Sequence, residues 1–301
     1  MLAVLQALLV TFLWSTSWIL VKIGLDDLDL APLSFAGLRY ALAAIILLPF
    51  GIRAIRVANR AQRMSGRLLA RVAVYGLLFV AIAQGAQFAA LAVLPATTVS
   101  LVLSSIPMWV AFMALAGGTE RATIGQAGGI GLLTFGALLY FGPSELEADA
   151  GIGFVAATVC VAAAAISSHM GRGLARDATA RLGGPIVLTA LSMSVGAAAL
   201  LGVGLALEGW PRLNLAGALI IGWLALVNTA FAFTLWNHTL RTLTAVESSV
   251  VNNTMTIQIA VLAIVFLGEQ LGPLQLIGLF LAATGAAVVQ IAPMLRSRYG
   301  R

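Results

Sequence analysis

Amide side chains interrupt several long apolar stretches of this chain, where they could hydrogen-bond the polar head group of a small molecule. Gln84 and Gln87 fall in one stretch and Asn228 falls in another. Aromatic residues share their helical faces, since Phe88 follows Gln84 by four residues and Trp236 follows Asn228 by eight. Aromatic rings stack on flat or cationic groups, so this pattern is typical of a binding site. For Trp236, which lies near the end of its stretch, a role at the membrane interface is an equal alternative.

Two further stretches carry polar triplets with the same i, i+4, i+7 spacing, which places each triplet on one helix face. The triplets are Ser100, Ser104 and Pro107, and Ser249, Asn253 and Thr256. Each face could line a shared cavity, or its side chains could bond neighbouring helices together. We favour the cavity, because an asparagine is costly to place elsewhere inside a membrane. Pro107 also leaves a backbone carbonyl of its helix without the usual donor.

Two tryptophans and two cations near the start of the chain complete the candidates. Trp14 and Trp18 share one face of the first apolar stretch. Lys22 and Arg39 lie within or at the ends of apolar stretches, where either could bind a carboxylate or phosphate of a ligand. The alternative is that both snorkel to the surface or pair with an acid of the Asp26–Asp29 segment.

The predicted binding residues are Trp14, Trp18, Arg39, Gln84, Gln87, Phe88, Ser104, Pro107, Asn228, Trp236, Asn253 and Thr256. No catalytic residue, cofactor or metal site is predicted, since neither His169 nor His238 has acidic or cysteine neighbours suited to a metal. Glu120 and Glu269 recur at equivalent positions, and each directly precedes an apolar stretch. A carboxylate there suits the positive end of a helix dipole, so we expect each to cap the helix that follows it.

These residues must be positioned by membrane helices, because hydrophobic residues make up 61% of the chain and charged residues 9%. Soluble domains carry about 25% charged residues. A helix needs about 20 mostly apolar residues to span a bilayer. The ten predicted spans cover about 2–24, 32–52, 69–92, 97–116, 123–142, 151–171, 185–207, 214–236, 245–267 and 272–293. We therefore expect an all-α membrane protein without a soluble domain.

The second half of the chain repeats the first at an offset of 149 residues. Ala90–Pro143 aligns without gaps on Thr239–Ala292, and the repeated glycines within it predict close helix packing. Five spans per copy is an odd number, so the second copy must cross the membrane upside down. Inverted copies place a binding site between them near the bilayer midplane. The predicted domains are the five-helix repeats 1–146 and 147–301.

The positive charges predict the orientation of the chain in the membrane. With a cytoplasmic N-terminus, the outer loops receive Arg212 and most of the acids, and the cytoplasmic loops receive almost all other arginines. These are Arg53, Arg56, Arg60, Arg63, Arg67, Arg71, Arg121, Arg172, Arg176, Arg181, Arg241, Arg296, Arg298 and Arg301. Such a bias follows the positive-inside rule, and ten spans return the C-terminus to the cytoplasm. The arginines therefore indicate topology and contact with anionic lipids rather than nucleic-acid binding.

Several short motifs, together with the repeat, make the chain similar to the ten-helix EamA-type branch of the drug/metabolite transporter superfamily. The motifs are Trp14-Ser-Thr-Ser-Trp18, Leu38-Arg39-Tyr40, Pro107-Met-Trp109, Leu267-Gly268-Glu269 and a twice-repeated Glu-x₅-Gln pattern. The resemblance implies an inner-membrane exporter or exchanger of small metabolites. It also implies a central cavity lined mainly by spans 1, 3, 4, 6, 8 and 9, with spans 5 and 10 at the periphery.

We expect a secondary transporter that exports small metabolites such as amino acids by alternating access of its two halves. The alternative is an exporter of multidrug or cationic aromatic compounds. A membrane enzyme acting on lipid phosphates is disfavoured, because the spans contain almost no acids for metal or acid–base chemistry. The expected partners are a small-molecule substrate and membrane lipids, and no nucleic acid. The sequence leaves open whether protons are a coupling ion and whether the chain is a monomer or a homodimer.

Overall fold

The computed structural model describes residues 2–60, 65–116, 123–141, 150–182, 185–239, 242–243 and 245–299. Within these residues, ten helical stretches are long and apolar enough to cross a membrane. In the first half they are α1 (Leu2–Asp26), α2 (Pro32–Arg60), the α3–η1–α4 stretch (Gly66–Gly76, Leu77–Ile82, Ala83–Val93), the α5–α6 stretch (Ala96–Leu103, Ile106–Ala116) and α7 (Ile124–Phe141). In the second half they are α8 (Ala150–Leu182), α9 (Pro185–Glu208), the α10–η2–α11 stretch (Leu215–Trp223, Leu224–Phe231, Ala232–Thr239), the α12–η3 stretch (Ala245–Leu262, Ala263–Leu267) and α13 (Pro273–Tyr299). The predicted all-α membrane fold is confirmed.

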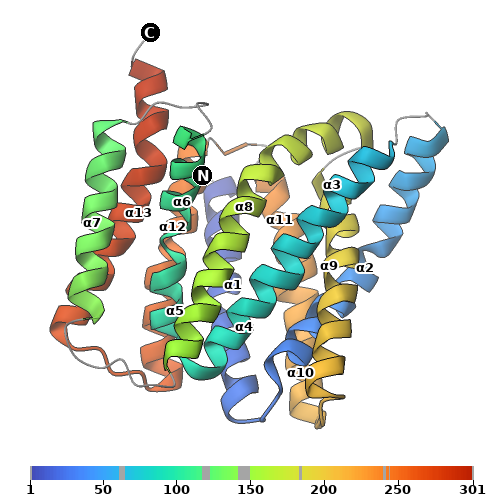
Figure 1. Ribbon diagram of the computed structural model, residues 1–301, viewed down its shortest axis with the longest axis horizontal. Coiled ribbons are helices and arrows are strands. Elements are labelled where there is room, and N and C mark those ends of the chain that lie inside the picture. The colour runs from blue at the N-terminus through green and yellow to red at the C-terminus, as the bar shows by residue number, and fades with distance from the viewer. Residues whose placement is uncertain are drawn as a thin grey trace.

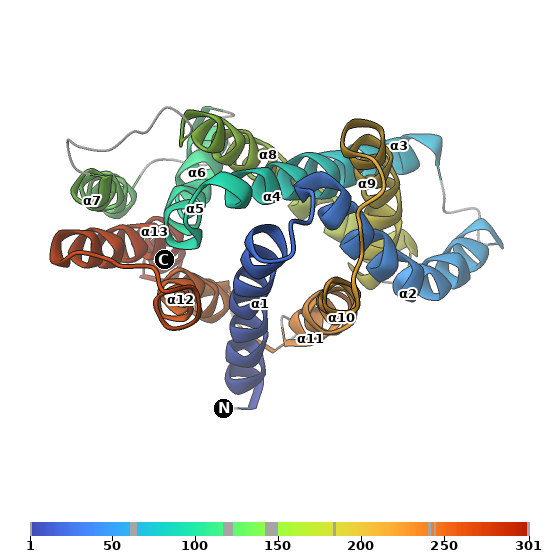
Figure 2. The same cartoon turned by 90° about the horizontal axis from the view of Figure 1, so that it is seen from below.

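The same helix pairs pack in both copies, as an inverted repeat requires. Helix α1 packs on α12 of the second copy, and its counterpart α8 packs on α5 and α6 of the first. Helix α4 packs on α8, and its counterpart α11 packs on α1. The pairs α7–α13 and α2–α9 each join a helix to its own counterpart. An approximate two-fold axis therefore relates the copies, and Figure 2 shows α1 between α12 and α11.

Helices α7 and α13 form one edge of the bundle, and α2, α3 and α9 form the opposite edge (Figure 1). Glycines let α7 and α13 approach closely. A methyl group on Gly129 would lie 2.9 Å from the Gly285 carbonyl oxygen, and one on Gly278 would lie 2.5 Å from that of Gly136. Because Gly278 and Gly285 are the repeat counterparts of Gly129 and Gly136, this contact is itself two-fold symmetric.

Each copy contains a π-helical segment at an equivalent place. The segments η1 in the third span and η2 in the eighth overlap when the 149-residue offset is applied. A π turn adds a residue to the α-helical register and occurs frequently at functional sites. The overlap therefore gives both copies the same π-helical irregularity in a helix that packs against the other copy.

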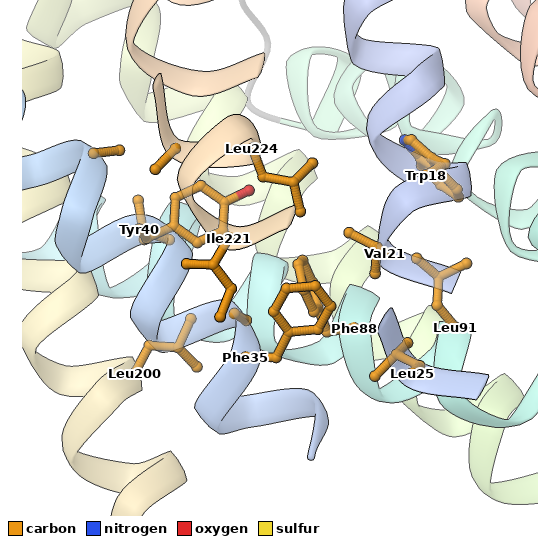
Figure 3. Packing of buried hydrophobic residues seen from close by; sticks show 14 of the residues in the cluster. Trp18, Val21, Leu25, Phe35, Tyr40, Phe88, Leu91, Leu200, Ile221 and Leu224 are labelled. Atoms are coloured by element: carbon orange, nitrogen blue, oxygen red, sulfur yellow. The ribbon is translucent and has the colours of Figure 1, made fainter. Parts of the chain in front are cut away.

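The largest hydrophobic core lies between the two copies, with side chains from α1, α2, α4, α9, α10 and η2. Phe35 and Phe88 are fully buried in it, and their rings meet edge to face with centroids 5.2 Å apart. Figure 3 shows these rings in the same cluster as Trp18, Tyr40 and Leu224. The core thus fixes α2 and α4 of the first copy against η2 of the second.

The two ends of the bundle differ in charge. One end, called the acidic end below, carries Asp26 and Asp27 at the close of α1 and Glu208 at the close of α9. The opposite or basic end carries arginines near the close of α2 and the start of α3. Glu208 caps α2, because it accepts hydrogen bonds from the backbone N–H groups of Leu33 (3.0 Å) and Ser34 (2.7 Å).

Glu269 also caps a helix, but the helix is not the one predicted. Its carboxylate accepts hydrogen bonds from the backbone N–H groups of Ala96 (2.6 Å) and Thr97 (3.2 Å), at the start of α5. The chain can turn back toward α5 because Gly268 adopts the left-handed conformation, with φ of 68°, at the end of η3. The prediction that Glu269 caps its own following helix, α13, is therefore wrong. Glu120 lies outside the described residues.

Candidate functional site

Asn228 of η2 is fully buried against α1, at the boundary between the copies. Its Nδ2 donates hydrogen bonds to the Leu13 carbonyl oxygen and to the Thr16 hydroxyl. Its Oδ1 and the indole N–H of Trp14 are both buried without a hydrogen bond to the described residues. A buried unpaired polar group costs about 1–3 kcal/mol. Asn228 therefore leaves one acceptor, and Trp14 one donor, that a ligand can satisfy.

The structure brings together two of the predicted aromatic residues from opposite copies. The Trp14 ring lies 5.2 Å from Phe233 and 5.3 Å from Trp236, both of α11, in tilted geometry. Each of these side chains is half-buried. The three rings form an aromatic cluster beside the α1–η2 contact.

Arg39 of α2 is buried in the membrane part of the bundle with 5% of its surface exposed. Its Nε donates a hydrogen bond of 3.2 Å to the Thr229 hydroxyl. Its guanidinium carbon lies 5.1 Å from the ring centre of Tyr40 and 6.0 Å from that of Phe88. No carboxylate of the described residues pairs with it. A buried charge is costly unless it is paired, so Arg39 is the strongest candidate for binding an anion.

Among the remaining candidates of α1 and α4, Gln84 makes a hydrogen bond to another helix, whereas the aromatic residues pack in the hydrophobic core. The Tyr40 hydroxyl donates a hydrogen bond of 2.6 Å to Gln84 Oε1, which joins α2 to α4. Gln87 is half-buried, as Gln84 is. Trp18 and Phe88 lie in the large core cluster, where they pack against other side chains. Their roles in substrate binding stay predictions.

The polar face predicted for the fourth span is interrupted. Helix α5 ends at Leu103 and α6 begins at Ile106, so Ser104 and Pro107 do not share one regular helix. The hydroxyl of Ser104 donates to the Leu101 carbonyl oxygen at 2.6 Å. This break at Pro107 agrees with the missing donor predicted from proline.

The matching face in the ninth span is continuous, because α12 carries no proline there. Asn253 Oδ1 accepts a hydrogen bond of 3.4 Å from Gln290 of α13, and Thr256 is buried. The side chain of Ser249 lies outside the described residues. Both described members of this face thus contact protein, and their part in a cavity stays a prediction.

Three residues that the sequence analysis did not select connect these elements. Thr229 and Tyr40 hold Arg39 and Gln84, as described above. Gln258 of α12 accepts a hydrogen bond of 2.9 Å from the Ser15 hydroxyl of α1. The available signal for Thr229 and Tyr40 is their position directly beside Asn228 and Arg39 in the chain.

A cavity of about 480 Å³ opens at the acidic end. Lys22 lines it and makes an ion pair of 3.1 Å with Asp26, which confirms the pairing alternative for this lysine. Lys22 Nζ also donates a hydrogen bond of 2.9 Å to the Leu91 carbonyl oxygen. The usual helical donor to that oxygen would be the nitrogen of Pro95, which has no hydrogen. Lys22 therefore ties α1 to the end of α4.

This architecture is found in a known protein family. The EamA-like transporter family matches the chain twice, over residues 1–142 and 151–291. No curated protein matches the chain. One solved structure, described only as the crystal structure of a protein, is 21% identical over 96% of this chain and 98% of its own, with a TM-score of 0.63. That likeness supports the fold, and the two family matches together span nearly the whole length. The chain therefore belongs to the EamA-like transporter family.

Proposed function

We propose that this membrane transporter carries a small metabolite with a carboxylate, such as an amino acid, through a site between the two copies. The observation that carries the proposal is the buried Arg39 guanidinium, which a hydroxyl and two rings hold without a carboxylate of the described residues. A buried cation without a counter-ion is destabilising, and a bound anion relieves that cost. The carboxylate of an amino acid supplies such an anion.

Groups of α1 and of the eighth span suit the rest of an amino acid. Asn228 directly precedes Thr229 in η2, and its unbonded Oδ1 can accept a hydrogen bond from an ammonium group. Trp14 and Trp236 offer ring faces for an apolar or aromatic side chain. These groups belong to both copies, so rocking one copy against the other would change which end of the bundle reaches the site.

The arginine bias supports a cytoplasmic basic end and an inner-membrane location. Alternating access would then release the substrate at the acidic end, outside the cell. The direction of export comes from the family resemblance. Both chain termini would lie in the cytoplasm.

Cationic aromatic compounds are the competing substrate class. The cluster of Trp14, Phe233 and Trp236 is an observation in their favour, because ring faces attract organic cations. Arg39 argues against them, because one buried cation repels another where the dielectric constant is low. We therefore rank them second.

Counterflow in proteoliposomes distinguishes the two classes. Vesicles preloaded with an unlabelled compound are diluted into the labelled form, for a panel of amino acids, aromatic quaternary cations and nucleosides. We expect accumulation of at least one amino acid and none of the cations. Accumulation of cations without amino-acid counterflow would overturn the proposal. A pH gradient across the same vesicles then tests proton coupling.

A further inference from the structure

The cavity at the acidic end shares no lining residue with the site around Arg39, yet it also contacts both copies. Its charged lining is Lys22, Asp26 and Asp27 of the first copy and Glu269 of the second. Its apolar lining is Ile23, Val93, Leu94, Pro95, Phe266 and Leu267. Its volume of about 480 Å³ falls within the range of roughly 300–1,000 Å³ that is typical of small-molecule sites.

The charges of this lining leave one carboxylate for a ligand. Glu269 is satisfied by the start of α5. Lys22 is held between Asp26 and the Leu91 carbonyl oxygen. Asp27 is exposed, and no ion pair joins it to the described residues. Among the described residues of the lining, three carboxylates stand against one ammonium group, so the cavity attracts cations rather than anions.

The walls decide which kind of cation fits. The described residues contain no group of three His, Cys, Asp or Glu side chains that could hold a metal ion. Val93 and Phe266, which are both exposed, instead offer apolar surface in the same cavity as Asp27. We infer that this cavity is a second binding site, which takes the ammonium group of a small amine with an apolar remainder. The ammonium group lies at Asp27 and the apolar part lies on the walls.

The position of the cavity gives it a place in transport. Lys22 and Glu269 hold the two sides of the Pro95 bend, one from each copy, so the cavity exists where the copies meet at the acidic end. An amino acid carries the ammonium group that the cavity selects. The role of the cavity as an exit site for the transported amino acid rests on the proposed function. The binding of an amine to the cavity does not depend on it.

Thiol labelling measures the charge of the cavity directly. Val93→Cys places a thiol on its wall, and Cys160→Ala removes the native thiol, which is buried. The purified protein in nanodiscs is then reacted with a methanethiosulfonate reagent. One version of the reagent carries a cationic trimethylammonium group, and the other carries an anionic sulfonate group. We expect the cationic reagent to react faster, and Asp27→Asn to slow it by about fivefold, the effect of one unit charge at roughly 4 Å in water. Asp29→Asn, the matched control, removes the same charge from a residue that does not line the cavity, and we expect it to leave the rate unchanged.

Protection by ligands tests binding. We expect isoamylamine to protect the thiol, and isoamyl alcohol, which has the same chain without the charge, to protect it at least about fivefold less well. Equal protection by both compounds, or equal effects of Asp27→Asn and Asp29→Asn, would overturn the inference. If Val93→Cys does not fold, Phe266→Cys places the thiol on the wall from the second copy.

The outcome is independent of transport. Protection by isoamylamine without any amino-acid counterflow would leave the amine site standing and refute the proposed function. Amino-acid counterflow without such protection would refute the amine site alone.

Discussion

Replacing Gly129 with alanine adds one methyl group where α7 and α13 meet. The new carbon would lie 2.8 Å from the Val289 backbone nitrogen and 2.9 Å from the Gly285 carbonyl oxygen, where ordinary contacts are 3.4–4 Å. The two helices would have to separate by roughly half an ångström or more to reach normal contact. Overpacking of this kind lowers the free energy of unfolding by about 1–3 kcal/mol.

The same helix supplies the control. Around Gly128, no described atom outside its own helical turn lies within 4 Å of the position of an added methyl group, so Gly128→Ala meets no clash with another helix. Alanine there should raise stability by about 0.5–1 kcal/mol, because glycine has the greater conformational freedom when unfolded. Gly278→Ala, at the repeat counterpart of Gly129, should destabilise as Gly129→Ala does. Unfolding by SDS in mixed micelles, followed by circular dichroism, measures all three variants. If Gly129→Ala is as stable as Gly128→Ala, the symmetric α7–α13 contact is refuted.

Three further substitutions test the acidic end and the central site. Glu269→Ala should lower the free energy of unfolding by about 1–2 kcal/mol, because α5 loses its cap. The control is Gln270→Ala, at the exposed neighbouring residue, and equal stability of the two variants would contradict the cap. Lys22→Met should lower the free energy of unfolding by about 1 kcal/mol in the same SDS titration, because the Leu91 carbonyl oxygen loses its donor, and an unchanged midpoint would show that this bond adds no stability. Trp14→Phe keeps a ring but removes the unpaired N–H, so it should raise the KM of counterflow by about three- to tenfold if the substrate accepts a hydrogen bond from that N–H. An unchanged KM would show that the substrate does not bond to the N–H.

The spans and their two-copy arrangement are readable from the sequence because hydropathy and charge are local properties. Each span must cover the membrane thickness with its own apolar residues, and the arginines must lie at helix ends. The partner of Glu269 is not readable in this way. A carboxylate ahead of an apolar stretch suits either its own helix or any other helix start nearby, and the choice of α5 depends on tertiary packing and on the turn at Gly268.

The candidate site could also be predicted from the sequence only in part. The cost of polar groups in a membrane pointed to Arg39 and Asn228, and both are buried between the copies. Trp14 and Trp236 meet across the copies, as a shared site needs. The sequence could not show that Thr229 would be the partner of Arg39, because the π-helical segment η2 changes which residues of the span share a face. The break between α5 and α6 likewise rearranged the face that regular helical spacing had assigned to Ser104 and Pro107.

The central claim is that Arg39 binds the substrate carboxylate between the two copies. The most direct measurement is inhibition of counterflow by two compounds, for the native chain and for Arg39→Gln. One compound is the transported amino acid, and the other is its amide, in which a neutral carboxamide replaces the carboxylate. The native chain should prefer the acid, and Arg39→Gln should lose roughly 10- to 100-fold in affinity for the acid while keeping its affinity for the amide. Arg212→Gln, at an exposed arginine, should behave like the native chain. An Arg39→Gln variant that still prefers the acid would contradict the account.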